Sequence, residues 1–203
     1  TFAVLSDTAA NLGTNGAVVN AALGQATAVS TTAAGSTAAQ LNYMDANAAS
    51  GVEVDATAAT GVDGAIADVL TATADTSGAI NVDTNYTSTV SGDQASTLSS
   101  LNTLMGRTTG NITATIGSGT AAAIDTALSN GSATDVLSIT TGSTTTTAAV
   151  INSLDGKTSE DVNVSAITAI TGTVANGATM VGNDGTDSGL TLAANYTFGA
   201  TAA

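Results

Sequence analysis

A short β-branched stretch that recurs seven times is the feature that most constrains how this chain folds. Each stretch begins at a small or acidic residue and alternates apolar with polar positions, as a strand with one buried face does. Their starts lie 25 to 35 residues apart, which is the length of one supersecondary unit in a repeat protein. The seven stretches are Gly16–Asn20, Gly51–Asp55, Gly78–Asp83, Gly110–Thr115, Asp135–Ile139, Asp161–Val164 and Gly189–Leu192.

Amphipathic stretches with helical spacing alternate with these strands. In Asp93–Met105, for example, Leu98, Leu101 and Leu104 fall on one stripe of a helix. The stretches that predict helices are Ser36–Asn47, Gly64–Thr73, Asp93–Met105, Thr120–Leu128, Thr145–Leu154 and Gly172–Val181.

Strands and helices that alternate with short connections indicate parallel pairing through right-handed crossovers. We therefore predict an α/β repeat, a right-handed β/α solenoid with a parallel sheet on one wall and short helices on the other. Residues 1–203 would form a single repeat domain of about seven irregular units of 25–35 residues. The alternative is a parallel β-helix, in which the helical stretches are extended, and the Thr-rich Gly142–Thr147 favours it.

The stretch Ala193–Ala203 contains two of the five aromatic residues, Tyr196 and Phe198. We expect it either to cap the core or to pair as an assembly strand with another chain.

The net charge of −14 comes from 16 acidic residues against only Arg107 and Lys157. Such a chain repels the phosphates of nucleic acid and the surface of anionic membranes, so we expect it to bind neither. No apolar run approaches the ~20 residues of a membrane span, so we expect no membrane insertion. The chain opens Thr-Phe-Ala-Val, with no basic start, and we expect a processed product or a piece of a longer protein.

The residue types argue against catalysis. The chain has no histidine and no cysteine, so the common catalytic triads and dyads are unavailable. Lys157 is the only lysine and falls in a predicted turn. We therefore expect that the protein is not an enzyme.

The ligand that the sequence indicates most specifically is a cation bound by one loop. The loop Gly182–Gly189 concentrates oxygen donors among glycines, as Ca²⁺ prefers, and makes Asn183, Asp184 and Asp187 the candidate ligands. A second candidate is Ser159-Glu160-Asp161. The alternative is an ordinary polar turn, since Asn, Asp and Gly are common in turns.

Two stretches, Leu101–Thr115 and Ile151–Gly177, resemble repeats of the form LN-x-LDG-x-T-x-G-x-V-x-A…ITGTAA. Such repeats occur in giant Thr/Ala/Gly-rich cell-surface proteins of marine cyanobacteria. The resemblance extends roughly from Thr37 to Val181, although Leu41–Asp45 lacks the Gly and Val62–Ile66 lacks the ITGT motif. It implies a large surface or extracellular structural protein and carries over no catalytic residue.

These observations together predict a non-enzymatic structural module of an extracellular bacterial repeat protein. It would self-assemble head to tail into a fibre or surface layer, because open repeat ends and a parallel sheet edge favour such contacts. The alternative is a calcium-dependent adhesin or a glycan-binding module at the cell surface.

Overall fold

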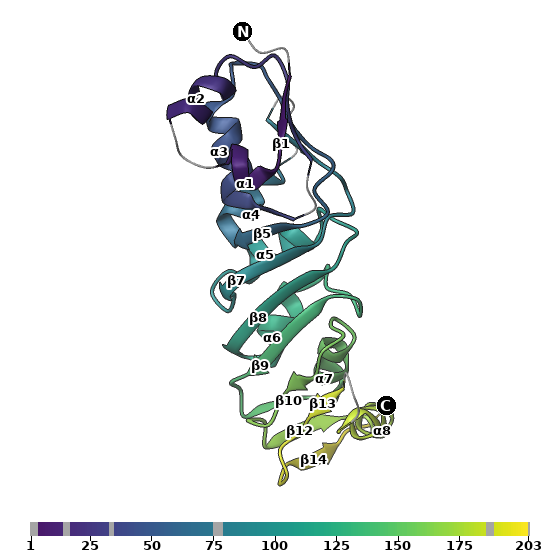
Figure 1. Ribbon diagram of the computed structural model, residues 1–203. Helices are drawn as coiled ribbons and strands as arrows, with labels where there is room; N and C mark the ends of the chain where they lie inside the picture. Colours follow the sequence, from purple (N-terminus) through teal and green to yellow (C-terminus); the bar gives the residue numbers. More distant parts are fainter. Residues whose placement is uncertain (1–3, 14–16, 33–34, 75–78, 186–188, 203) are drawn as a thin grey trace. The chain divides into compact units, whose positions relative to one another are not determined.

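The protein is a mixed α/β structure with parallel sheets and, among the described residues, eight helices (Figure 1). The computed structural model describes residues 4–13, 17–32, 35–74, 79–185 and 189–202. The chain divides into two compact units. The first is Thr1–Ser91 with Gly106–Asn111, and the second is Gly92–Met105 with Ile112–Ala203.

The first unit contains two series of parallel strands and four helices. One series is a four-stranded sheet in the order β1-β2-β4-β6, and the other pairs β3 with β5 and β5 with β7. The strands are β1 (Leu5–Asp7), β2 (Val29–Thr31), β3 (Ser36–Thr37), β4 (Val54–Ala56), β5 (Val62–Ala65), β6 (Ile80–Val82) and β7 (Ser88–Asp93). The helices are α1 (Ala9–Leu12), α2 (Ala17–Leu23), α3 (Ala38–Asn47) and α4 (Ile66–Ala72).

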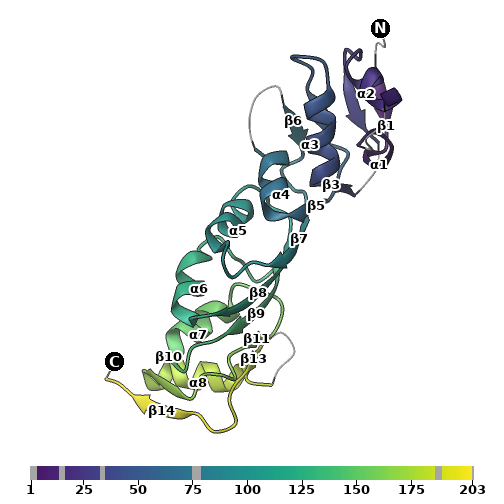
Figure 2. The ribbon, with the colours of Figure 1, turned by 90° about the vertical axis from the view of Figure 1, so that its left-hand side faces the viewer.

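The second unit has the same construction. Its strands form the parallel orders β8-β9-β11-β13 and β10-β12-β14. Figure 2 shows α5 and α6 beside each other, on one side of β8 and β9. The strands are β8 (Ile112–Gly119), β9 (Val136–Thr141), β10 (Thr145–Thr147), β11 (Val162–Asn163), β12 (Ala169–Gly172), β13 (Leu190–Thr191) and β14 (Thr197–Ala200). The helices are α5 (Leu98–Met105), α6 (Ala121–Ala127), α7 (Ala148–Asp155) and α8 (Val174–Asn183).

The sequence separation between paired residues is nearly constant. Every described pair between named strands is parallel and joins residues from 22 apart (Gly119 with Thr141) to 28 apart (Val162 with Leu190). Each strand therefore pairs with its counterpart one strand–helix segment later in the chain. A segment here means the one or two strands before a helix together with that helix.

Aliphatic side chains from strands and helices form the core. In the second unit the strands contribute Ile112, Ile116, Leu137, Ile139 and Val162, all at most 1% exposed. The helices contribute Leu101, Leu104, Ile124, Ile151 and Leu154, which are fully buried. Burial of each such side chain stabilises the fold by about 1.5–3 kcal/mol. The expected alternation is clear in β11, where Val162 is buried and Asn163 is partly exposed.

All six predicted helices are present, and six of the seven predicted strands overlap β4, β6, β8, β9, β11 and β13. The strand prediction Gly16–Asn20 is wrong, because α2 begins at Ala17. The stretch is followed by Ala21-Ala22-Leu23, and these good helix formers extend it into a helix. The β-helix alternative is wrong for most of the stretches predicted as helices, since α3 to α8 are helical, but Gly142–Thr147, which favoured that alternative, contains the strand β10.

Eight strands, β1, β2, β3, β5, β7, β10, β12 and β14, are not among the seven predicted strands, although β14 falls in Ala193–Ala203, where we expected a cap or an assembly strand with another chain. In the structure β14 pairs with β12 of the same chain. Two of the eight, β3 and β10, fall at the starts of stretches that we predicted as helices. Among the described residues a threonine caps five helices, and its hydroxyl accepts the N–H of the third helical residue at 3.2–3.3 Å. The capping residues are Thr8, Thr37, Thr120, Thr147 and Thr173.

Candidate assembly surface

Several acidic side chains join one strand–helix segment to the next. The Oδ1 atoms of four aspartates accept a backbone N–H 23 to 28 residues away, at 2.7–2.8 Å. The pairs are Asp63 with Thr89, Asp93 with Gly117, Asp135 with Ile112, and Asp161 with Gly189. The N–H groups of Gly117 and Ala95 also hold the pKa of Asp93 below its usual value. Four of the 16 acidic residues therefore have a structural role of this kind.

The predicted calcium ligands Asn183 and Asp184 lie at the end of α8 and make hydrogen bonds within the protein. Asn183 Nδ2 donates to Asp155 Oδ2 at 2.7 Å, and Asp184 Oδ1 accepts the N–H of Leu192 at 3.2 Å. Asp187, the third candidate, lies outside the described residues. No group of three or more acidic residues that could hold a metal ion occurs among the residues that the structure describes.

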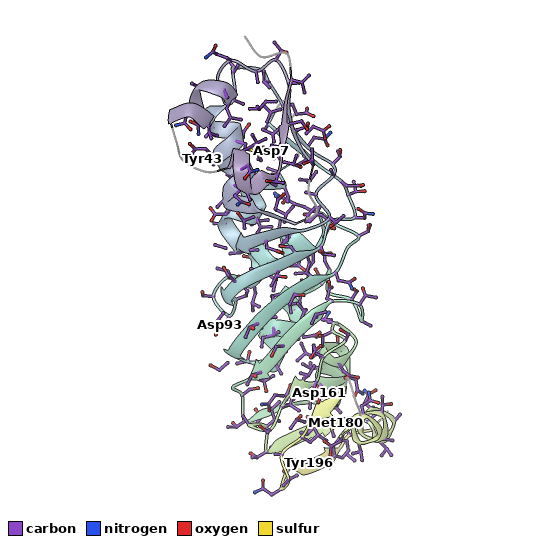
Figure 3. The ribbon with its side chains drawn as sticks, in the orientation of Figure 1. Asp7, Tyr43, Asp93, Asp161, Met180 and Tyr196 are labelled. Atoms are coloured by element: carbon purple, nitrogen blue, oxygen red, sulfur yellow. The ribbon has the colours of Figure 1, made fainter. Side chains whose placement is uncertain are left out.

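The second calcium candidate is likewise part of the hydrogen-bonding framework. The Asp161 carboxylate accepts the N–H of Gly189, as above, and Ser159 Oγ donates to the carbonyl of Asp135 at 3.0 Å. The position of Asp161 in the second unit is shown in Figure 3. The hydrogen bonds give Ser159 and Asp161 a structural role.

Asp155, at the C-terminus of α7, was not predicted as a functional residue. Burial raises the pKa of its carboxyl group, the hydrogen bond from Asn183 lowers it, and the nearby charge of Asp161 raises it further. Its Oδ1 atom is buried and has no hydrogen-bond partner. The contact with Asn183 links the ends of α7 and α8.

Three helices carry an asparagine at the fifth position that reaches the following segment. Asn42 Nδ2 of α3 donates to the carbonyl of Asp68 at 3.0 Å, and Asn152 Nδ2 of α7 donates to that of Asn176 at 3.0 Å. Asn102 Nδ2 of α5 donates to Ser129 Oγ at 3.2 Å. We call α3, α5 and α7 the Asn helices.

The two cations each contact a helix that lies between Asn helices in the sequence. Arg107 Nη1, two residues beyond α5, donates to the carbonyl of Leu70 at 2.6 Å, near the end of α4. Lys157 Nζ, two residues beyond α7, lies 3.5 Å from Asp125 Oδ1 of α6. Both cations follow an Asn helix and contact a residue of the helix that precedes it.

The side of α8 that does not face α7 is apolar and open. Together with β14 it forms a groove of about 420 Å³. Val174 is 70% exposed, Val181 53% and Phe198 36%, and they account for three of the four exposed large hydrophobic side chains among the described residues. Figure 3 shows the positions of Met180 and Tyr196, which also line the groove. The lining residues are Val174, Gly177, Ala178, Met180, Val181, Tyr196, Phe198 and Ala200.

Gly177 and Phe198 form the floor of this groove. The fourth residue of α6 and of α7 is isoleucine, Ile124 and Ile151, and both are fully buried. The fourth residue of α8 is Gly177, and a Cβ placed there would lie 2.6 Å from Cζ of Phe198. The Phe198 ring thus occupies the space that an isoleucine side chain would otherwise need.

β14 is the outer strand of the β10-β12-β14 sheet, and all four of its residues are exposed. Thr197–Ala200 contains no charged residue and no proline, which are the common means of protecting a strand edge. The groove and this edge together form one uncharged surface, which we call the α8–β14 surface. The sequence pointed to Tyr196 and Phe198, but not to Val174, Val181 or Gly177.

Comparison with known proteins found no match to any family model, curated protein or solved structure. Among the described residues, none of the helices combines the length and the apolar character that crossing a bilayer requires.

Proposed function

We propose that the chain is a non-enzymatic structural module of an extracellular bacterial repeat protein, and that its strand–helix segments form a right-handed β/α solenoid. The nearly constant separation of paired residues supports stacked segments, because neighbouring turns of a solenoid pair in this way. The hydrogen bonds from Asp63, Asp93, Asp135 and Asp161 add support, since each joins one segment to the next.

We further propose that copies assemble head to tail into a fibre or surface layer through the α8–β14 surface. The observation that carries this proposal is the grouping of Val174, Val181 and Phe198 around one uncharged groove. The fourth exposed large hydrophobic residue among those described is Val4, beside the outer strand β1 of the first unit. The absence of charged residues from the groove lowers the repulsion that copies with a charge of −14 would otherwise meet at the α8–β14 surface.

Sedimentation velocity over a range of protein concentrations, with electron microscopy of the same samples, tests this assembly. We expect association that grows with concentration, and we expect Val174→Glu to reduce it because the variant places a charge in the groove. Ala175→Glu is the matched control, since Ala175 is an exposed residue of the same helix turn but does not line the groove. A monomer at all concentrations would contradict the proposal.

The alternative, a calcium-dependent adhesin or glycan-binding module, remains a prediction. Its test is the melting temperature with and without millimolar calcium, together with a glycan array. A melting temperature that does not change would reject a calcium site in the Gly182–Gly189 loop.

A further inference from the structure

The helices α3 to α8 alternate between two classes. In each Asn helix the fourth residue is a buried aliphatic residue, the fifth is the asparagine and the seventh is a second buried apolar residue. These are Leu41-Asn42-Tyr43-Met44, Leu101-Asn102-Thr103-Leu104 and Ile151-Asn152-Ser153-Leu154. The intervening helices α4, α6 and α8 have Leu70, Asp125 and Ala178 in place of the asparagine. The repeating element is therefore a pair of segments.

The contacts follow the same alternation. An Asn helix donates its amide N–H to the segment after it, whereas α4 and α6 are contacted by the cation that follows the next Asn helix. The side of α8 away from α7 has neither kind of contact among the described residues. Because Asn helices alternate with the other helices and α8 is not an Asn helix, a further helix packed against that side of α8 would be an Asn helix.

The backbone after β14 is already in register for such a helix. All four residue pairs between β12 and β14 are 28 residues apart, from Ala169 with Thr197 to Gly172 with Ala200. The next residue after β12 is Thr173, the N-cap of α8, and its counterpart at the same separation is Thr201. The N–H of Thr201 donates to the carbonyl of Gly172 at 2.9 Å, which continues the ladder to this point.

The sequence at this position is that of a helix start. Thr201-Ala202-Ala203 is identical to Thr147-Ala148-Ala149, which begins the Asn helix α7. Thr37-Ala38-Ala39 begins the Asn helix α3 in the same way. A threonine N-cap followed by two alanines combines a strong cap with the best helix formers.

We propose that the α8–β14 surface binds one further strand–helix segment, whose helix is an Asn helix capped by Thr201. The inference rests on the stacking in the proposed function and specifies the segment that fits. Its apolar residues would cover Val174, Val181 and Phe198, and β14 would be the strand of that segment. The small exposed residue Ala178 lets the new helix approach α8 closely.

A chain extension tests the proposal. The test variant has a second copy of residues 150–172 added after Ala203. Since these residues follow Thr147-Ala148-Ala149 in the chain, the copy continues Thr201-Ala202-Ala203 with the sequence of the Asn helix α7 and of the strands β11 and β12. The matched control adds residues 123–145 instead, which has the same length and continues the Thr-Ala-Ala start of α6. Chymotrypsin cleavage after Tyr196 and Phe198 and the urea midpoint of unfolding are the measurements.

We expect the Asn-helix extension to slow cleavage at Tyr196 and Phe198 by about tenfold or more, because the segment must open before the protease reaches them. We expect it to raise the urea midpoint, whereas the control extension changes both less. Equal behaviour of the two extensions, or no protection by either, would overturn the inference.

The outcomes separate this inference from the proposed assembly. If the 203-residue chain stays monomeric but the Asn-helix extension protects the aromatic residues, the assembly proposal fails and the inference stands. If the chain self-associates through this surface and neither extension protects it, the occupant is a second copy and the inference is wrong.

Discussion

The helix α8 has two sides that differ in almost every respect. On the side of α7, Asn152 and Asn183 form hydrogen bonds between the two segments, and Ile151 and Leu154 of α7 are fully buried. On the other side Val174 and Val181 are more than half exposed, and no hydrogen bond to a further helix exists among the described residues.

The difference separates two components of the contact between neighbouring segments. One is apolar contact, and the other is the set of side-chain hydrogen bonds that fix the register, which we call polar registration. The α8–β14 surface offers the apolar part alone. Apolar contact is not directional, so it favours association but does not define one register. The asparagine and aspartate contacts supply the direction, since each requires a particular donor and acceptor. The predictions below test this division.

The largest contrast is expected between Ile151→Ala and Val174→Ala. Ile151 is fully buried, and its truncation leaves a cavity that should lower the free energy of unfolding by about 2–5 kcal/mol. Val174 is 70% exposed, and its truncation should change the stability by no more than about 0.5 kcal/mol. Urea unfolding at low protein concentration measures both, and similar losses would contradict the proposed difference between the two sides.

Gly177→Ile restores the residue type found at this position in α6 and α7. Its side chain collides with the Phe198 ring, so we expect a loss of about 1–3 kcal/mol. Phe198→Ala in the same chain removes the collision, and the two changes should couple by about 1 kcal/mol or more. A double-mutant cycle in urea measures this coupling, and simple additivity would show that the ring does not occupy the isoleucine position.

Asn152→Asp tests the polar registration with a nearly isosteric change. The carboxylate cannot donate to the carbonyl of Asn176, so we expect a loss of about 1–2 kcal/mol at neutral pH. Asn195→Asp is the control, because it makes the same change in an exposed turn before β14. If thermal or urea unfolding shows the same effect for both variants, the Asn152 contact contributes no registration energy.

The smallest effect is expected for Asp155→Asn. Because the folded-state pKa of Asp155 is raised above 3.8, its stabilising contribution is present below that pH and is lost as the pH rises through the folded pKa. At pH 7 the variant should therefore be slightly more stable, by about 1–2 °C in Tm. Calorimetry at pH 7 and pH 3 measures the gain, which should shrink at the lower pH.

Asp93→Asn is the control of opposite sign. The pKa of Asp93 is lowered, so its contribution is present above 3.8 and is lost as the pH falls through the folded pKa. The variant should be less stable than the parent at pH 7, with the difference shrinking in acid. Changes of the same sign in both variants would show that a general charge effect is responsible.

The sequence predicted those parts of the fold in which apolar periodicity is strong. Stretches such as Asp161–Val164 and Asp93–Met105 bury β-branched or leucine residues at regular spacing, and both contain the expected element. The strands that were not predicted, such as β3 and β10, have little such periodicity. In β10, Thr145–Thr147, the paired strand and the N-cap of α7 give the threonines their role, and neither is apparent from local sequence.

The candidate surface was harder to predict for a related reason. Val174 and Val181 occupy α8 as apolar helix residues, and the sequence does not show which apolar residues find a partner. Ile151 and Val174 look equivalent by type, yet one is buried and the other exposed. The calcium prediction at Asn183 and Asp184 was based on their oxygen atoms and did not anticipate their hydrogen bonds with Asp155 and Leu192.

The short separation of paired residues also bears on how the protein folds and how its length could change. Contacts between residues 22 to 28 apart require only small loops to close, so folding can begin at several places and spread to neighbours. Loss or gain of a single segment would place two helices of one class together. Changes in length that keep the alternation would come in steps of 50 to 60 residues, the spacing of Asn42, Asn102 and Asn152.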